Sequence, residues 1–209
     1  ITPIIFTQNK FNLKKLYADF PEYENILGSG GKDKRFDKPI FHRLNIFTET
    51  PTGDSYKILG MYDKKRAWRY IPQKYVEKHE NLLRYKVILP VSNGSGAIGE
   101  TLSTPLIGEP LIGYTRSFIG IGAFETNTEA QACLKYIKSK FARTMLGVLK
   151  ITQDNTTEKW AKVPLQNFTT NSDIDWSRPI PEIDQQLYKK YGLTEQEIEF
   201  IESKVKEMK

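Results

Sequence analysis

Cysteine and histidine are almost missing from this chain, which limits the chemistry that it can perform. Cys133 is the only cysteine, and His42 and His79 are the only histidines. One cysteine excludes an intrachain disulfide and most zinc sites, and it is typical of a reducing cytoplasm. The two histidines have no partners at a spacing that indicates a metal site or a catalytic triad. We therefore expect a cytoplasmic protein segment without catalytic residues or metal ligands.

Long apolar runs are also missing. No stretch of about 18 apolar residues occurs, so no membrane-spanning segment is predicted. Residues 1–4 contain no methionine and do not begin a signal peptide, because no basic region precedes an apolar stretch. We interpret the sequence as part of a longer protein. With 39% hydrophobic and 27% charged residues, its composition is that of an ordinary globular protein and argues against disorder.

Acidic residues are scarce in the first part of the chain and abundant in the last. Residues 1–90 carry 17 Lys/Arg against 10 Asp/Glu, whereas residues 171–209 carry 6 against 9. A basic body favours a polyanionic partner, and an acidic tail favours a different one. Modestly basic domains that never meet nucleic acid are nevertheless common, so charge alone leaves the choice open.

Strand-like and helical patterns alternate in a way that predicts an α+β fold. Residues rich in β-branched and aromatic side chains predict strands at 40–47, 56–62, 67–71, 85–89 and 117–124, with a short helix at 73–83. We expect a mixed twisted sheet with packed helices. Asn12 is a candidate cap for an early helix that Pro21 would end.

The later part of the chain is predicted to be helical. Apolar residues from Ala130 to Val148 recur every three to four positions, which predicts one helix over 129–150. Its opposite, basic face would hold Lys135, Lys140, Arg143 and Lys150. A C-terminal helical hairpin follows, with Gly192 as the stop signal of its first helix and Thr194 and Glu197 in a capping-box pattern.

Two short motifs that suggest catalysis or cofactor binding have simpler explanations. Residues 94–99 match G-x-G-x-x-G, but Pro105 prevents the helix that a dinucleotide site needs. A loop, or a nest of backbone amides that holds one phosphate, fits better. Residues 202–204 (Glu-Ser-Lys) mimic a nuclease motif but lie on a predicted helix, and no upstream Asp is placed to share a metal.

Several segments of the chain resemble the C-terminal region of bacterial adenine-specific restriction–modification enzymes. Their order also resembles the recognition domains of type I specificity subunits and the TaqI-like specificity domain. The resemblance covers about residues 56–200, and its most specific run is 182–193. The segments that carry it are 85–90, 93–96, 104–108, 117–124, a helix ending in 141–143, 159–168, 173–177 and 182–193.

The resemblance implies a target-recognition domain that follows an N6-adenine DNA methyltransferase. Such a parent protein uses S-adenosylmethionine, and also magnesium where a nuclease is fused. The methyltransferase tetrad, Asn/Asp-Pro-Pro-aromatic, is missing here, so this chain would carry no cofactor of its own. We expect the recognition domain at 56–170 and the hairpin at 171–209. Residues 1–55 would form a connector or the N-terminal part of the recognition domain.

Double-stranded DNA and the catalytic domains of the parent protein are the expected partners. The basic segment 64–70 is interleaved with aromatic residues, which suits phosphate contact but also suits a solvated turn before a strand. The acidic hairpin would dock on the rest of the protein through Leu187, Tyr188, Ile198 and Ile201. The candidate DNA contacts are Lys64, Lys65, Arg66, Arg69 and Arg116 for phosphates, Asn93, Ser95, Tyr114, Gln153 and Asn155 for base edges, and Lys140 and Arg143 on the basic helix face.

Two other interpretations remain open from the sequence. In one, the basic face binds an acidic part of the parent complex and DNA is read elsewhere. In the other, Glu202 and Lys204 belong to a nuclease.

Overall fold

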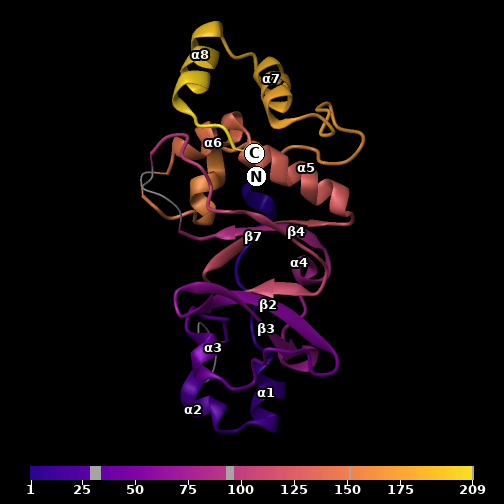
Figure 1. Cartoon of the computed structure of the whole chain (residues 1–209). Coiled ribbons are helices and arrows are strands. Elements are labelled where there is room, and N and C mark those ends of the chain that lie inside the picture. The colour runs from indigo at the N-terminus through magenta and orange to yellow at the C-terminus, as the bar shows by residue number, and fades with distance from the viewer. Residues whose placement is uncertain (29–33, 93–96, 151, 209) are drawn as a thin grey trace.

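Two small β-sheets form the middle of the molecule, and helices cover the outer side of each (Figure 1). The computed structural model describes residues 1–28, 34–92, 97–150 and 152–208. The upper sheet is antiparallel and has the strand order β1 (Ile5–Phe6), β7 (Phe118–Phe124), β4 (Tyr85–Pro90), β5 (Leu106–Gly108). The lower sheet has the order β3 (Lys65–Pro72), β2 (Ser55–Tyr62), β6 (Ile112–Tyr114), with β2 and β6 parallel.

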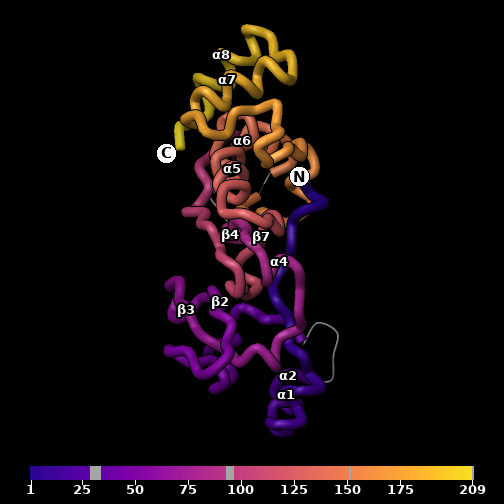
Figure 2. The backbone as a smooth tube through the Cα atoms, turned by 90° about the vertical axis from the view of Figure 1, so that its right-hand side faces the viewer, coloured from indigo at the N-terminus to yellow at the C-terminus, as the bar shows by residue number. Residues whose placement is uncertain are grey.

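The helices are stacked at the two ends of an elongated molecule (Figure 2). Helices α5 (Asn127–Lys138) and α6 (Lys140–Gly147) lie above the upper sheet, and α7 (Ile180–Tyr191) and α8 (Glu195–Lys204) pack on them. Below the lower sheet lie α1 (Leu13–Asp19), α2 (Tyr23–Leu27) and α3 (Ile40–Arg43). The remaining short helices are α4 (Glu80–Leu83), which contacts β7, and the 3-10 helices η1 (Thr2–Ile4), η2 (Gln73–Tyr75) and η3 (Thr157–Lys162).

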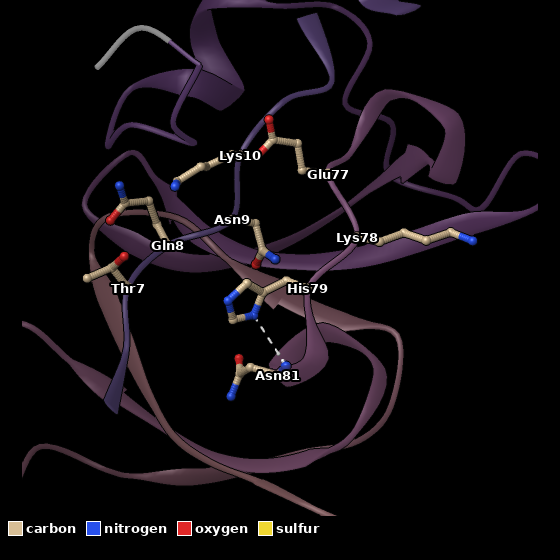
Figure 3. A pocket seen from close by; sticks show the side chains of 8 residues that line it. All are labelled: Thr7, Gln8, Asn9, Lys10, Glu77, Lys78, His79 and Asn81. Atoms are coloured by element: carbon tan, nitrogen blue, oxygen red, sulfur yellow. Dashed lines mark hydrogen bonds between the residues drawn. The ribbon is translucent and has the colours of Figure 1, made fainter. Parts of the chain in front are cut away.

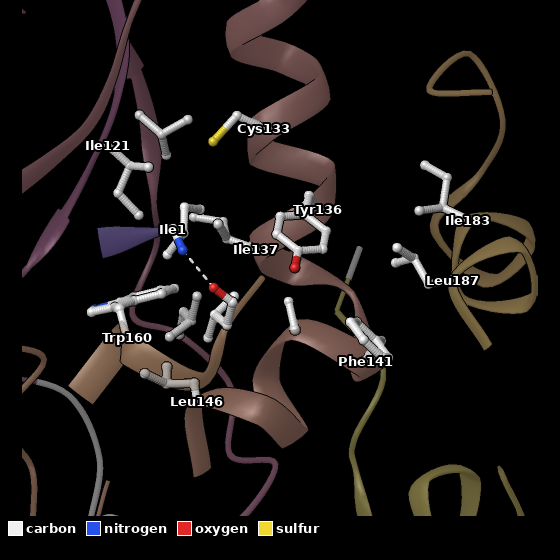
Figure 4. Close-up of a cluster of buried hydrophobic side chains, with 14 of the residues drawn as sticks. Ile1, Ile121, Cys133, Tyr136, Ile137, Phe141, Leu146, Trp160, Ile183 and Leu187 are labelled. Carbon is white, nitrogen blue, oxygen red and sulfur yellow. Dashed lines mark hydrogen bonds between the residues drawn. The ribbon is translucent and has the colours of Figure 1, made fainter. Parts of the chain in front are cut away.

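Three clusters of buried apolar side chains hold these layers together. The largest joins the upper sheet to α5–α8, and Figure 4 shows Ile183 and Leu187 of α7 facing the α5–α6 pair. The second joins residues 11–47 to β2 and β3, so most of the N-terminal segment shares a core with the lower sheet. The third lies between the sheets and contains Leu59, Ile88, Tyr114 and Phe118.

The α+β class is confirmed, and so are several local predictions. The strands expected at 56–62, 67–71, 85–89 and 117–124 correspond to β2, β3, β4 and β7. Thr194 and Glu197 form the capping box of α8, and Gly192 ends α7 in the left-handed conformation. Among the described residues, no helix has the length and apolar character needed to cross a membrane.

Three secondary-structure predictions are wrong. The expected strand at 40–47 is α3 followed by a turn at residues 45–46, because Ile40, Phe41 and Leu44 have helical spacing and point together into the lower core. The expected helix at 73–83 is two separate short helices, η2 and α4. The single helix expected over 129–150 is broken at Ser139, whose extended backbone ends α5 and whose side chain caps α6 by accepting a hydrogen bond from Ala142 N (3.1 Å).

Candidate functional site

The main hollow of interest lies at the waist, where the two sheets meet. Two adjoining hollows of about 700 and 650 Å³ share Lys38, Pro39, Val91 and Ser92, and we call their union the waist groove. The lower half contributes α3 and the β2–β3 turn, and the upper half contributes the end of β4 and the start of β7. Its charged lining consists of Arg35, Lys38, Lys64 and Arg116 with Asp37, Asp63, Asp154 and Glu158.

The β2–β3 turn places Lys64 at this groove with a strained backbone conformation. Tyr62 pairs with Lys65, so Asp63 and Lys64 form a two-residue turn. Both residues have positive φ, 47° and 63°. Such turns favour Asn-Gly, because a side chain in the left-handed region costs about 1 kcal/mol. Strain of this kind at a surface turn is a feature that functional sites often carry.

A stack of side chains supports that turn. The His42 ring lies on Tyr62, with ring centroids 4.1 Å apart and an angle of 13°. His42 Nε2 is also 3.6 Å from Asp63 Oδ1. The Arg69 guanidinium also lies over the Tyr62 ring, 4.9 Å from its centroid. Arg69 forms an ion pair with Glu49 at 2.9 Å. Arg69, a predicted phosphate contact, therefore supports the turn and is already paired.

The cations of the groove differ in how far they are paired. Arg116 lies 3.6 Å from Asp37, and both side chains are largely exposed, so water screens this pair and leaves Arg116 available. Within the described part of the chain, no ion pair involves Lys38, Lys64 or Lys65, and all three are exposed. Of these, Lys64, Lys65 and Arg116 were predicted from sequence, whereas Lys38 was missed because nothing marks a lone lysine before a proline.

Arg66, another predicted phosphate contact, connects the β2–β3 hairpin to the upper half of the molecule. Its guanidinium donates to Thr104 O (2.9 Å) and Ser103 O (3.0 Å). It also lies over the Phe118 ring, 5.6 Å from the centroid. Partial burial lowers the pKa of Arg66 from its usual value. Arg66 therefore fixes the position of the β2–β3 hairpin beside the groove.

The segment after residue 152 is fastened to the end of β4. Ser92 and Asp154 form an isolated bridge, and Ser92 Oγ donates to Asp154 Oδ1 (3.2 Å). The Asn155 side chain donates to Pro90 O (3.2 Å), and Trp160 Nε1 donates to Asn155 O (3.3 Å). Asn155 has no exposed surface, so its predicted contact with a base edge does not fit this structure. Gln153 is exposed, as a base contact requires.

Tyr114 is likewise an interior residue rather than a surface contact. It is 1% exposed, and its hydroxyl donates to Asn81 Oδ1 (2.9 Å). A side chain at Gly120 would collide with that hydroxyl, which shows how tightly β6 packs on β7 here. Burial raises the pKa of Tyr114. Its role is to join the two sheets, so the prediction that it reads a base edge is corrected.

The predicted basic face of the 129–150 segment is covered by the chain itself. Arg143 is 2% exposed and donates to Gly99 O (2.9 Å), to Lys138 O (3.0 Å) and to Lys206 O. Lys140 pairs with Glu202 of α8. The Lys135 ammonium donates to the carbonyls of residues 176–178. Arg143 and Lys140 are therefore not surface DNA contacts in this structure.

The acidic hairpin of this same chain covers that face. Leu187, Tyr188 and Ile201 are buried in the upper core, and Ile198 packs against it. Glu202, from the nuclease-like motif, also accepts a hydrogen bond from the Tyr188 hydroxyl (2.9 Å). Among the described residues, no group of three or more acidic, histidine or cysteine side chains could hold a metal ion. The motif at 202–204 thus has a structural explanation.

Another cavity, much smaller than the waist groove, is also lined in part by Thr7 and Gln8. It measures about 80 Å³ and is lined by polar side chains that include Asn9, His79 and Asn81 (Figure 3). His79 Nδ1 accepts a hydrogen bond from Asn81 N (3.3 Å), so His79 caps α4. Ligand sites are usually several times larger. The cavity is sized for water and is not the candidate site.

Two predicted residues, Asn93 and Ser95, lie outside the described residues, as do the first three residues of the glycine-rich motif at 94–99. Sequence reasoning did not single out Arg35, His42 or Ser92, which line the groove. Only tertiary structure brings these three segments together.

Comparisons with known proteins found no similarity to report: no protein-family model, no curated protein and no solved structure matches this chain.

Proposed function

We propose that this chain is the sequence-specific recognition domain for double-stranded DNA in a restriction–modification protein. The waist groove is the observation that carries the proposal. It combines exposed lysines from the lower half, Lys38 and Lys64, with hydrogen-bonding side chains from the upper half, such as Ser92 and Asp154. Reading DNA requires both, because cations position the protein on phosphates and neutral or acidic groups distinguish bases.

The proposed roles follow from exposure. Lys38, Lys64, Lys65 and Arg116 contact phosphates, whereas Ser92, Gln153 and Asp154 face base edges. The domain positions the target adenine for extrusion into a methyltransferase pocket in another part of the parent protein. S-adenosylmethionine, and magnesium where a nuclease is present, belong to that other part, and no residue of this chain is assigned to them. The sequence resemblance described above supports this division.

The alternative, a docking module that binds an acidic partner through the basic helix face, has less support. Lys135, Lys140 and Arg143 of that face already bind the chain's own C-terminal segment.

A salt titration of duplex binding tests the proposal. Fluorescence anisotropy of labelled random-sequence duplexes would be measured between 50 and 200 mM salt, for the wild type and for Lys38→Ala/Lys64→Ala. Each phosphate contact contributes about 0.9 to the slope of log K against log salt, so the double variant should lose about 2. Lys14→Ala/Lys189→Ala removes the same charge from exposed sites on α1 and α7, and should leave the slope almost unchanged.

Two results would contradict the proposal. One is the absence of duplex binding by the wild type at 50 mM salt. The other is an equal loss of slope in both double variants, which would mean that net charge, and not the groove, attracts DNA.

A further inference from the structure

The four carboxylates of the waist groove are not equivalent. Asp37 lies 3.6 Å from Arg116, and Asp63 lies 3.6 Å from His42. Hydrogen bonds from its own backbone and from Thr156 hold the pKa of Glu158 below its usual value. Asp154 accepts a hydrogen bond from the neutral hydroxyl of Ser92, 3.2 Å away. Among the described residues, no ion pair joins a cation to Asp154.

The backbone around Asp154 is nevertheless firmly held. The bridge to Ser92 fixes it on one side. On the other side, the buried Asn155 is locked between Pro90 O and the Trp160 indole. A carboxylate presented from such a support loses little conformational entropy on binding, which is the condition for a specificity contact.

A carboxylate in a DNA-binding groove can pair with few groups on DNA. It only accepts hydrogen bonds, and phosphate repels it. In the major groove the donors are the N4 amino group of cytosine and the N6 amino group of adenine. Adenine also presents the N7 acceptor next to N6, and N7 repels the second carboxylate oxygen, whereas cytosine presents no acceptor there. Cytosine is therefore the better match.

We infer that Asp154 reads the amino group of a cytosine, so the recognised DNA sequence contains a C·G pair at the position that faces Ser92 and Asp154. This inference rests on the proposed DNA-reading function and adds one base of its specificity. Removal of the carboxylate should weaken selection at that position only, by about 5- to 100-fold. Asn in place of Asp offers a donor and an acceptor together, which is the arrangement that pairs with adenine N6 and N7.

The test is a selection of bound duplexes from a randomised pool, followed by sequencing, with the wild type, Asp154→Asn and Asp37→Asn. Asp37→Asn is the matched control, because it removes a carboxylate from the same groove, one that lies 3.6 Å from Arg116. We expect the wild-type site to contain a position occupied by cytosine that changes to adenine with Asp154→Asn. With Asp37→Asn the site should stay the same and overall affinity should change about equally for all sequences.

The outcomes separate this inference from the function on which it rests. If the wild type enriches a defined site and Asp154→Asn enriches the same site, the role of Asp154 is wrong while DNA recognition stands. If both aspartate variants change the same position, the effect is not specific to Asp154 and the inference fails. If the wild type enriches no sequence at all, the proposed function itself is wrong.

Discussion

The two groups of cations in this protein have opposite environments, one interior and paired, the other exposed. Arg143 and Lys140 on α6 are covered by the chain itself: Arg143 donates to Gly99 O and Lys206 O, and Lys140 pairs with Glu202. Lys38 and Lys64 at the waist are exposed and have no ion-pair partner among the described residues. Both groups look alike in the sequence. The difference teaches that a basic pattern indicates a polyanion site only where the fold leaves it uncovered.

The largest expected effect is the removal of an interior cation. Arg143→Ala leaves four backbone carbonyls without their charged donor at a site that is 2% exposed. We expect a loss of about 3 kcal/mol of stability and a Tm lower by about 6–10 °C. Differential scanning calorimetry measures both.

Lys64→Ala is the comparison variant and should leave Tm within about 1 °C, because surface substitutions rarely cost more than a few tenths of a kcal/mol. Similar losses of Tm in both variants would remove the distinction between the two groups.

A second effect concerns Asp184 on α7, which fastens the hairpin to α6. Its carboxylate accepts hydrogen bonds from Phe141 N (2.9 Å) and Lys140 N (3.0 Å), and burial raises its pKa to about 6. The nearby Glu202 raises this pKa further, whereas Arg143 lowers it. Between about pH 4 and 6 the folded state therefore binds a proton that the unfolded state does not. Stability from this group is greatest below about pH 4 and is lost as the pH rises through about 6, by about 3 kcal/mol in all.

Urea unfolding at pH 4.5 and at pH 7, for the wild type and Asp184→Asn, isolates this contribution. Exposed carboxylates such as Asp19 and Asp173, whose pKa values are lowered by lysine partners, give the opposite slope in both proteins and cancel in the difference. The wild type should lose more stability, or gain less, than the variant between pH 4.5 and pH 7. An identical pH dependence of the two proteins would show that Asp184 is not buried in solution.

Local signals in the sequence predicted the strands and the helix caps, because the residues that form them lie within a few positions of each other. Ser139 was missed as a helix break, since Phe141 and Leu146 continue the apolar spacing of α5 across it. The interior role of Arg143 could not be predicted either. Its acceptors Gly99 and Lys206 are 44 and 63 residues away along the chain, and no local pattern reports contacts at that separation.

The lining of the waist groove could also be predicted only in part from local sequence patterns. The β2–β3 lysines were predicted as contacts from their density in the sequence, and the structure leaves Lys64 and Lys65 exposed. Lys38 and Ser92 join Lys64 only because α3 and the end of β4 meet at the waist. For Asn155 and Tyr114, residue type alone favoured base contact, whereas the fold uses their polar atoms to hold its own elements.

The smallest expected effect is also the one that contrasts the two groups of cations most directly. Lys64 occupies a left-handed position, φ 63°, that glycine would occupy without strain. Lys64→Gly removes about 1 kcal/mol of strain, and the greater flexibility of unfolded glycine offsets part of this, so stability should rise by about 0.5 kcal/mol. Lys65→Gly loses the same charge from a regular strand position and should destabilise by about 0.5–1 kcal/mol. Chemical denaturation compares the two. If Lys64→Gly gains stability while its DNA affinity falls, the lysine is retained at a cost to the stability of the fold, whereas the interior Arg143 contributes to that stability. If Lys64→Gly is destabilised as much as Lys65→Gly, the turn is not strained and Lys64 has no stability cost that binding must explain.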